Sequence, residues 1–507
     1  MRKDSEELTP VNSNGKWAYI DKAGNEVIPY KYDEAGNFSE GRANVKFNGK
    51  WGFIDRSGKE IIPYKYDDTW NFSEGLAGVK LNDKWAYIDK AGREIIPYKY
   101  DNVHSFSEGL AGVKLNYKWA YIDRTGAEII PYKYDEAWKF SEGRASVKFN
   151  DKWGFIDRTG AEVIPCKYNY TQPFSEGFAG VKLNDKWAYI DRAGKEIIPY
   201  KYDETGNFSG GLARVLLNDK SGFVNQTGDE VILCKYDYAG NFSEGLACVR
   251  LDGKWGFIDQ TGAEVIPCRY DYAESFSGGL ARVLLNGKNG FVDRAGVEVI
   301  PCKYDYTGDF SEGLAIALLN DKWTYIDKTG VEIIPCKYER AESFSGGLAH
   351  VSLNDKWGYI DKTGVEIIPC KYDYAGYFSE GLTCINLNDG WGFLDKAGKE
   401  IIPCEYDYAG DFLDGLAIVL LDGEWGFIDK TGAEIIPCKY EQAETFSGGL
   451  ALVSLNGEWG FIDKTGAEII PCKYDYAESF SDGLATVSLN DERFYIDITG
   501  KYVKDWE

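Results

Sequence analysis

Apolar residues alternate with polar or small residues over short stretches of this chain, and the stretches recur at a fixed spacing. In the stretch 76–81, Ala77, Val79 and Leu81 occupy every second position, which is the period-two pattern of a half-buried strand. An Asn–Asp pair follows, and other copies have Asn–Gly at this point, as at Asn48–Gly49. Asn–Gly between two apolar stretches is a strong signal for a β-hairpin. The pattern therefore predicts two antiparallel strands joined by a tight turn.

A third strand is predicted after a second turn. The second strand, 84–89, leads into Asp89–Gly92, where Asp can bond its own backbone and Gly tolerates positive φ. The third strand begins near residue 94 and is expected to end at Pro97, since proline cannot donate to a ladder. The remaining residues, 98–109, are predicted to form a surface connection. Each unit is thus expected to be a three-stranded β-meander.

The unit recurs every 34 residues without insertion or deletion. Gly24 recurs through Gly500, and Trp17 recurs in twelve of fifteen units. The three departures from tryptophan are Ser221, Asn289 and Arg493. One meander cannot bury its apolar face alone, so neighbouring units must stack. We therefore expect an all-β protein in which tandem 34-residue three-stranded β-meander repeats form an open superhelical or solenoid array, with a closed β-propeller as the alternative.

The two ends of the chain favour the open array. Leu8 already falls on the register of Leu76, so the repeats begin close to the N-terminus. A ring propeller often splits one blade between its termini, and no such split is visible here. The expected organisation is an N-terminal cap at 1–7, fifteen repeats in one continuous array at 8–503, and a C-terminal tail at 504–507.

Several motifs resemble the WG repeat, also called the KWG repeat, of bacterial proteins. They are the Trp–Gly pair, as at Trp51–Gly52, the Asp-x-x-Gly turn, as at Asp55–Gly58, and the Phe-Ser-Glu-Gly stretch, as at Phe72–Gly75. The resemblance covers the chain from about Leu8 onward. It implies the same fold class and a cytosolic or envelope bacterial setting, and it transfers no catalytic residue.

Composition narrows the range of partners. The net charge is −24, which argues against nucleic acid or an anionic membrane surface, because both need a positive footprint. No stretch approaches the ~18 apolar residues of a membrane-spanning helix, so membrane insertion is not expected. The N-terminal stretch MRKDSEELTP does not resemble a signal peptide. Eleven cysteines cannot all pair internally, which fits a reducing compartment, and we expect a cytoplasmic protein.

Little in the sequence indicates catalysis or a cofactor. The only histidines, His104 and His350, lie in different units and different registers, and no nucleophile elbow or phosphate loop is present. The cysteine series that begins at Cys166 has tyrosine in earlier units, as at Tyr30, and tyrosine cannot replace a zinc thiolate in a structural site. The aspartates of the Asp-x-x-Gly stretch are explained by turn formation. We therefore expect no enzyme activity, no cofactor and no metal.

The function of an array is expected at positions that vary while their neighbours stay fixed. Two groups stand out, one on the face of the first strand taken to point outward, and one in the connection after Tyr32 and its equivalents. The main hypothesis is a non-catalytic scaffold that binds a protein partner through the variable strand face, and random drift after duplication is the competing explanation. The candidate partner-binding residues are Lys46, Lys80, Lys114, Lys148, Lys182, Arg214, Arg282 and His350.

Aromatic residues in the connection suggest a second class of function. Trp70, Trp138 and His104 occupy one variable register, where a large ring would be exposed, and a glycan or cell-wall polymer could stack on them together with the tyrosines of the connection. A third class is a structural spacer or a self-assembling element. The recurring tryptophans of the second strand are interpreted as packing residues between neighbouring sheets.

Overall fold

The structure is a computed structural model, and every regular element that it describes is a β-strand. The expected cap at 1–7 and tail at 504–507 lie outside the described residues. No helix long and apolar enough to cross a membrane occurs in the described part of the chain. The described residues are 8–13, 15–21, 26–413, 415–447, 449–480 and 483–503.

Each repeat forms one antiparallel sheet, and the third repeat is typical. Its strands are β8 (Asp68–Thr69), β9 (Leu76–Leu81), β10 (Lys84–Asp89) and β11 (Glu94–Tyr100), hydrogen-bonded in that order. The three predicted strands and the open array of repeats are confirmed. Two features differ from the prediction: the two-residue β8 adds a fourth strand, and β11 continues through Pro97.

The third strand can include proline because it is an edge strand. An edge strand leaves one row of N–H groups unpaired, so the missing donor of Pro97 costs little there. The pairing of β10 with β11 is also irregular, with register shifts on both sides of Tyr87. These bulges bring the backbone of the third strand close to the second-strand residue that follows the tryptophan. In the fifth repeat, a Cβ on Gly154 would lie 2.6 Å from the backbone nitrogen of Cys166, which explains the glycine of the Trp–Gly pair.

The sheets number fifteen in the described residues, and they recur at the sequence period. The first is three-stranded, with β1 (Thr9–Ser13), β2 (Lys16–Ile20) and β3 (Glu26–Tyr32), and the last runs from β56 (Tyr476–Ala477) to β59 (Tyr502–Val503). No strand of the last sheet pairs with the first in the part of the chain that is described, so the array is open rather than a closed propeller. We number the repeats 1 to 15 in chain order.

The turns confirm the predicted chemistry. Asn82 and Asp83 adopt φ of 48° and 59°, the left-handed conformations that a tight two-residue hairpin turn requires. The Oδ1 atom of Asp89 accepts hydrogen bonds from the backbone nitrogens of Ala91 at 2.9 Å and Arg93 at 3.0 Å. The aspartate therefore closes the second turn on its own backbone.

Sheets inside the stack are buried on both faces against neighbouring sheets. In one such layer, Tyr87 and Ile96 of repeat 3 pack against Val113 and Ile122 of repeat 4, and all four are at most 1% exposed. The phenol of Tyr87 donates to the backbone oxygen of His104 in the next repeat at 2.6 Å. Because the sheets stack, side chains that point to either face of the first strand are covered by a neighbouring sheet.

The Phe-Ser-Glu-Gly stretch links successive repeats with polar contacts. Ser73 donates to the carbonyl of Phe106 at 2.7 Å. The carboxylate of Glu74 accepts from the backbone nitrogen of Gly109 at 2.9 Å and from the Arg124 guanidinium at 3.0 Å. One glutamate therefore connects two points of the next repeat to its own repeat.

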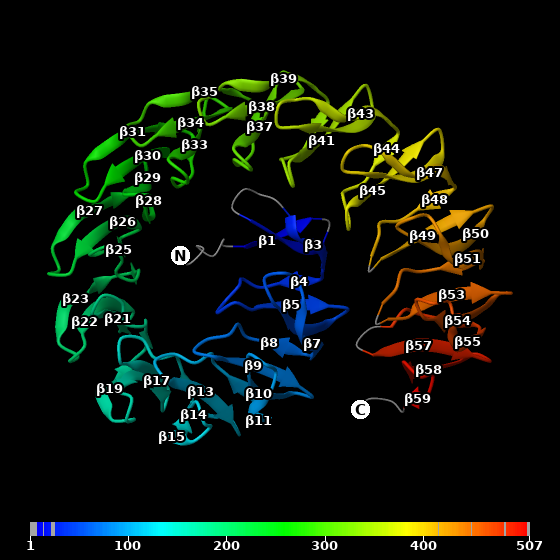
Figure 1. Cartoon of the computed structure of the whole chain (residues 1–507). Coiled ribbons are helices and arrows are strands. Elements are labelled where there is room, and N and C mark those ends of the chain that lie inside the picture. The colour runs from blue at the N-terminus through cyan, green and yellow to red at the C-terminus, as the bar shows by residue number, and fades with distance from the viewer. Residues whose placement is uncertain are drawn as a thin grey trace, which may run out of the picture.

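The stack curves into a superhelix (Figure 1). Third strands such as β31 (Glu264–Tyr270) and β35 (Glu298–Tyr304) lie on the outside, and first strands such as β33 (Leu280–Leu285) and β37 (Leu314–Leu319) lie on the inside. The short fourth strand is the opposite edge of each sheet from the third strand, so it belongs to the inner wall. The curve carries the chain round until the later repeats lie beside the first repeats.

The first repeat is covered by later repeats instead of by a predecessor. In repeat 3, the face formed by Val79, Ile88 and Tyr98 packs on repeat 2. The equivalent residues of repeat 1, Val11, Ile20 and Tyr30, line a cavity whose other wall comes mainly from repeats 11–13.

The stacked layers predict a large difference between buried and exposed aromatic side chains. Phe257, in β30 (Lys254–Asp259), is fully buried, and we expect Phe257→Ala to lower the free energy of unfolding by about 3–5 kcal/mol. Urea unfolding followed by circular dichroism measures the change. The matched control is Tyr117→Ala at a hairpin turn, where the side chain is 86% exposed and the expected change is within about 0.5 kcal/mol. Equal losses for both variants would contradict the stacked arrangement.

Candidate functional site

The lysine row lies on the first strands, directly opposite the second group of variable positions. Lys46 of β5 (Ala43–Phe47) pairs across the strands with Glu34 of β4 (Glu34–Ala35). The stretch interpreted as a variable surface connection is therefore a strand beside the lysines. Four of the five lysines make ion pairs within their own repeat, so the row is not a free basic stripe. The pairs are Lys46–Glu34 at 3.1 Å, Lys80–Asp83 at 2.9 Å, Lys148–Glu136 at 3.1 Å and Lys182–Asp185 at 3.7 Å. For Lys114, the structure gives a cross-strand pairing with Asn102.

The other candidate residues on the first strands, Arg214, Arg282 and His350, do not form an outward face. The expectation that they point outward was wrong. His350 is 7% exposed, and Arg214 is half-buried. The guanidinium of Arg282 donates to the carbonyl of Thr307 in the next repeat at 2.6 Å and to the Oε1 atom of Glu274 at 2.5 Å. The reason is that stacked sheets cover both faces of the strand, whereas the sequence pattern was interpreted for a sheet with one solvated face.

Trp70 and Trp138 are partly exposed on the inner edge of their sheets, and His104 is not freely exposed. The two tryptophans are 43% and 47% exposed. Trp70 stacks on Trp85 with ring centroids 5.8 Å apart, and its indole nitrogen donates to the carbonyl of Val103 at 3.1 Å. His104 stacks on Trp119 at 4.4 Å. The Trp70 indole thus joins repeats 3 and 4, and both indoles keep surface for a ligand.

A row of tyrosines follows the inner wall through the later repeats. Each lies at the first position of a short strand and is 40–47% exposed. Six of the seven contact second-strand tryptophans of their own or the neighbouring repeat, with ring centroids 5.2–6.0 Å apart. We call this set the tyrosine row: Tyr170, Tyr238, Tyr272, Tyr306, Tyr374, Tyr408 and Tyr476.

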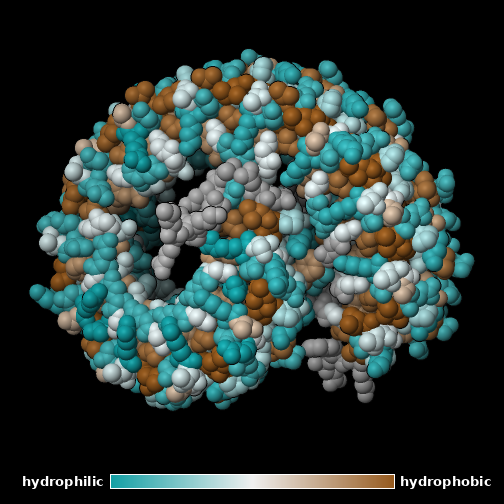
Figure 2. All heavy atoms as spheres, viewed as in Figure 1, coloured by the Kyte–Doolittle hydropathy of each residue, from teal (hydrophilic) through white to brown (hydrophobic). Residues whose placement is uncertain are grey.

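The tyrosine row was only partly recognised from the sequence. The tyrosines of the connection were noted as possible stacking residues, and the second-strand tryptophans beside them were interpreted separately as packing residues. The available signal was the spacing: Tyr170 lies 17 residues after Trp153 and 17 before Trp187, which places both indoles beside it once the sheets stack. The space-filling view shows that the repeats enclose a hollow, which the inner wall faces (Figure 2).

Both histidines are held in environments that disfavour a charged imidazole. Burial lowers the pKa of His350 to about 4. Burial, together with the charge of Lys139, lowers the pKa of His104 to about 4. Neither nitrogen of the His350 ring has a hydrogen-bond partner in the described residues. Both rings are therefore neutral at pH 7.

The cysteines are packing residues in this arrangement. All eleven lie in the described residues and are unpaired. Burial, and then the charge of Glu162, raise the pKa of the Cys166 thiol to about 11. Within the described ranges, no group of three or more His, Cys, Asp or Glu side chains is placed to hold a metal ion.

One family profile matches the repeats along most of the chain. The family profile described as WG containing repeat matches fourteen consecutive segments between residues 17 and 492. No curated protein matches the sequence.

Solved structures give more distant likenesses. The extracellular domain of BT4673 from B. thetaiotaomicron is 10% identical, with 99% of this chain and 84% of that chain covered at a TM-score of 0.26. PorZ, a bacterial surface component of the type-IX secretion system of Porphyromonas gingivalis, is 9% identical, with 92% and 86% covered at 0.25. A eukaryotic initiation factor is 10% identical, with 71% and 95% covered at 0.30. We take nothing about the function of this chain from likenesses at this level.

The expectation of a cytoplasmic location is contradicted by these comparisons and is not retained. Among the similar structures are extracellular domains of BT4673 and a component of the bacterial surface. The expectation had depended on the amino-acid composition near the N-terminus and on the cysteine count.

The buried histidines predict a specific pH dependence. The folded pKa values near 4 lie below the ordinary value of about 6.5, so the unfolded chain binds protons first as the pH falls. The stability contributed by the two neutral rings is therefore lost between about pH 6.5 and pH 4. NMR titration of the two imidazoles, assigned with His104→Asn and His350→Asn, should give midpoints below pH 5. Midpoints near 6.5 would contradict the burial of these rings.

Proposed function

This chain belongs to the WG-repeat family, and we propose that it is a non-catalytic scaffold that binds an extended glycan along its inner wall. The observation that supports the proposal is the tyrosine row, in which seven half-exposed rings occupy one register of successive or nearly successive repeats. Face-to-face sheets are spaced about 10 Å apart, so the rings recur at a regular interval. A polymer with a repeating unit can contact each ring in the same way.

Sugar rings have the surface chemistry that this wall offers. Their C–H faces are apolar and pack on aromatic rings, while their hydroxyl groups need donors and acceptors at the edges. Polar side chains lie across the strands from four of the seven tyrosines, as Lys182 does from Tyr170 and Arg250 from Tyr238, and leucines lie across from the other three. The net charge of −24 disfavours nucleic acid, the other common polymer that stacks on aromatic rows. Each ring contributes weakly, so affinity should rise with the number of rings that one chain contacts.

Binding of a protein partner through the lysine row is the weaker proposal. Its support in the sequence was a continuous basic stripe, and carboxylates of the same repeats already accept from most of these ammonium groups. Exposed ion pairs are worth about 0–1 kcal/mol each, so the cost of breaking them would not prevent a partner from docking. The paired carboxylates nevertheless balance the charge of the lysines, and an acidic partner is then attracted less strongly.

The glycan proposal predicts a length-dependent affinity that requires the tyrosine row. We expect calorimetric titration with chitin-derived oligosaccharides and purified peptidoglycan strands to show tighter binding of longer chains. The variant Tyr238→Ala/Tyr272→Ala/Tyr306→Ala should weaken binding of the longest chains at least about tenfold, because it removes three adjacent rings.

Tyr117→Ala is the matched control, because it removes an exposed tyrosine from a hairpin turn outside the row. It should bind as the unchanged chain does. Retained affinity in the triple variant, or no binding of either glycan preparation to the unchanged chain, would contradict the proposal.

A further inference from the structure

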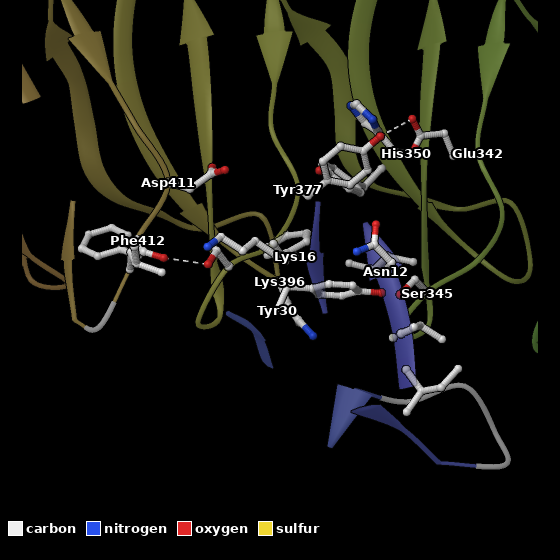
Figure 3. Close-up of a pocket in the computed structure, with 18 of the residues that line it drawn as sticks. Asn12, Lys16, Tyr30, Glu342, Ser345, His350, Tyr377, Lys396, Asp411 and Phe412 are labelled. Atoms are coloured by element: carbon white, nitrogen blue, oxygen red, sulfur yellow. Dashed lines mark hydrogen bonds between the residues drawn. The ribbon is translucent and has the colours of Figure 1, made fainter. Parts of the chain in front are cut away.

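The cavity between the first repeat and the later repeats has the size of a small-ligand site. Its volume is about 610 Å³, within the range of sites that bind small organic molecules. Repeat 1 supplies Val11, Ile20 and Tyr30 from the face that packs on the preceding repeat elsewhere in the array. Residues from repeats 11–13 line the opposite side (Figure 3), among them Glu342, His350, Tyr377, Lys396, Asp411 and Phe412.

Lys396 is a member of a repeated ion-pair position whose partner is missing, and among the described lysines that lack this glutamate it is the one that lines the cavity. In repeats on both sides, the basic residue 50 positions after the glutamate of the Phe-Ser-Glu-Gly stretch pairs with that glutamate. Lys362 pairs with Glu312 at 2.7 Å, and Lys430 pairs with Glu380 at 2.8 Å. The position 50 residues before Lys396 is Gly346, which has no side chain to offer.

The missing carboxylate leaves the exposed Lys396 side chain at the cavity without an ion pair in the described residues. Its contact in the described residues is with the ring of Phe378, at 5.8 Å from the centroid, and no carboxylate there pairs with it. Both Lys396 and Gly346 line the cavity. The repeat pattern therefore shows which chemical group is absent at this point: one carboxylate.

His350 is the second group in the cavity that lacks a partner. The side chain is 7% exposed, and neither ring nitrogen has a hydrogen-bond partner in the described part of the chain. The ring is fixed by stacking on Trp357 at 4.2 Å and on Tyr359 at 4.8 Å. A buried polar group without a partner costs free energy, so a ligand that hydrogen-bonds the imidazole gains by satisfying it.

Aromatic rings form the rest of the wall. Tyr377 occupies a register that holds Asn37 in repeat 2 and Asp411 in repeat 13, so its ring is particular to this place in the array. Its phenol donates to Glu342 at 2.5 Å, which fixes the ring beside His350. Phe412 also lines the cavity. The walls can therefore enclose a planar or alicyclic ring between repeat 1 and repeat 12.

We propose that this cavity binds a small organic acid with a ring body, whose carboxylate takes the place of the missing glutamate at Lys396. The ring packs among Tyr377, Phe412 and the apolar face of repeat 1, and a hydroxyl or similar group on the ligand hydrogen-bonds His350. The site adjoins the glycan surface proposed above at Tyr408, which lines the cavity, whereas the rings of repeats 6–10 do not.

The test uses the full chain and two probes of nearly the same shape, of which one carries a carboxylate and the other a neutral carboxamide. In calorimetric titration, 4-hydroxyphenylacetate should bind and 4-hydroxyphenylacetamide should bind at least about tenfold more weakly. Lys396→Gln should remove that difference. The matched control is Lys328→Gln, at the same repeat position beside Gly278, where the lysine lies outside the cavity and the probe affinities should not change.

A second variant, Gly346→Glu, places a carboxylate of the protein itself where the ligand carboxylate is proposed to bind. Gly346 has φ of +60°, close to the +52° of Glu312, so Gly346→Glu should fold and supply the missing partner to Lys396. It should abolish acid binding, whereas Gly278→Glu should leave it unchanged. Thermal unfolding checks that both variants are folded. Equal binding of acid and amide, no binding of the acid at millimolar concentration, or full binding by a folded Gly346→Glu protein overturns the proposal.

Discussion

Face-to-face burial of small sheets is the constraint on which the whole molecule depends. Four short strands present apolar side chains on both faces, and a single sheet has nothing of its own with which to cover them. Each sheet therefore needs a neighbour on either side, as Tyr87 needs the layer formed by Val113 and Ile122. Because the same layer must form at every step, the spacing of the units cannot drift, and the period of 34 residues is kept throughout.

The ends of such a stack are the places where the constraint is not met locally. Repeat 1 has a complete apolar face against which no preceding sheet packs in the described residues, and the superhelix brings the inner wall of repeats 11–13 over it. The curvature of the stack thereby covers this face of repeat 1. A cover that arises in this way is less closely fitted than a repeat-to-repeat layer, and the cavity lies where the fit is incomplete.

Local features of the fold followed from the sequence, and features that depend on distant contacts did not. The hairpin at Asn82–Asp83 and the turn closed by Asp89 are set by a few adjacent residues, so pattern and turn chemistry predicted them. The short strand was missed because its two residues carry no periodic signal and pair only through their neighbours. The burial of His350 was missed because alternation cannot distinguish a sheet covered on one face from a sheet covered on both.

The candidate sites illustrate the same division. The exposure of Trp70 followed from its variable position in one repeat, whereas the tyrosine row needs the stacking of several repeats to become a continuous surface. The isolation of Lys396 is visible in the sequence as a glycine 50 residues earlier, once the structure shows that this spacing joins an ion pair. Its position opposite repeat 1 depends on the sum of all the angles between sheets, which no local pattern records.

The closure of the superhelix onto its own first repeat is the central claim, and amine cross-linking of the monomeric chain tests it most directly. Lys16 of repeat 1 and Lys396 of repeat 12 both line the cavity, and their ammonium groups are accessible. Cross-linking with a short lysine-reactive reagent, followed by mass spectrometry of the peptides, should join Lys16 to Lys396. A result in which lysines of neighbouring repeats are joined and Lys16 is never joined to repeats 11–13 would contradict the closure.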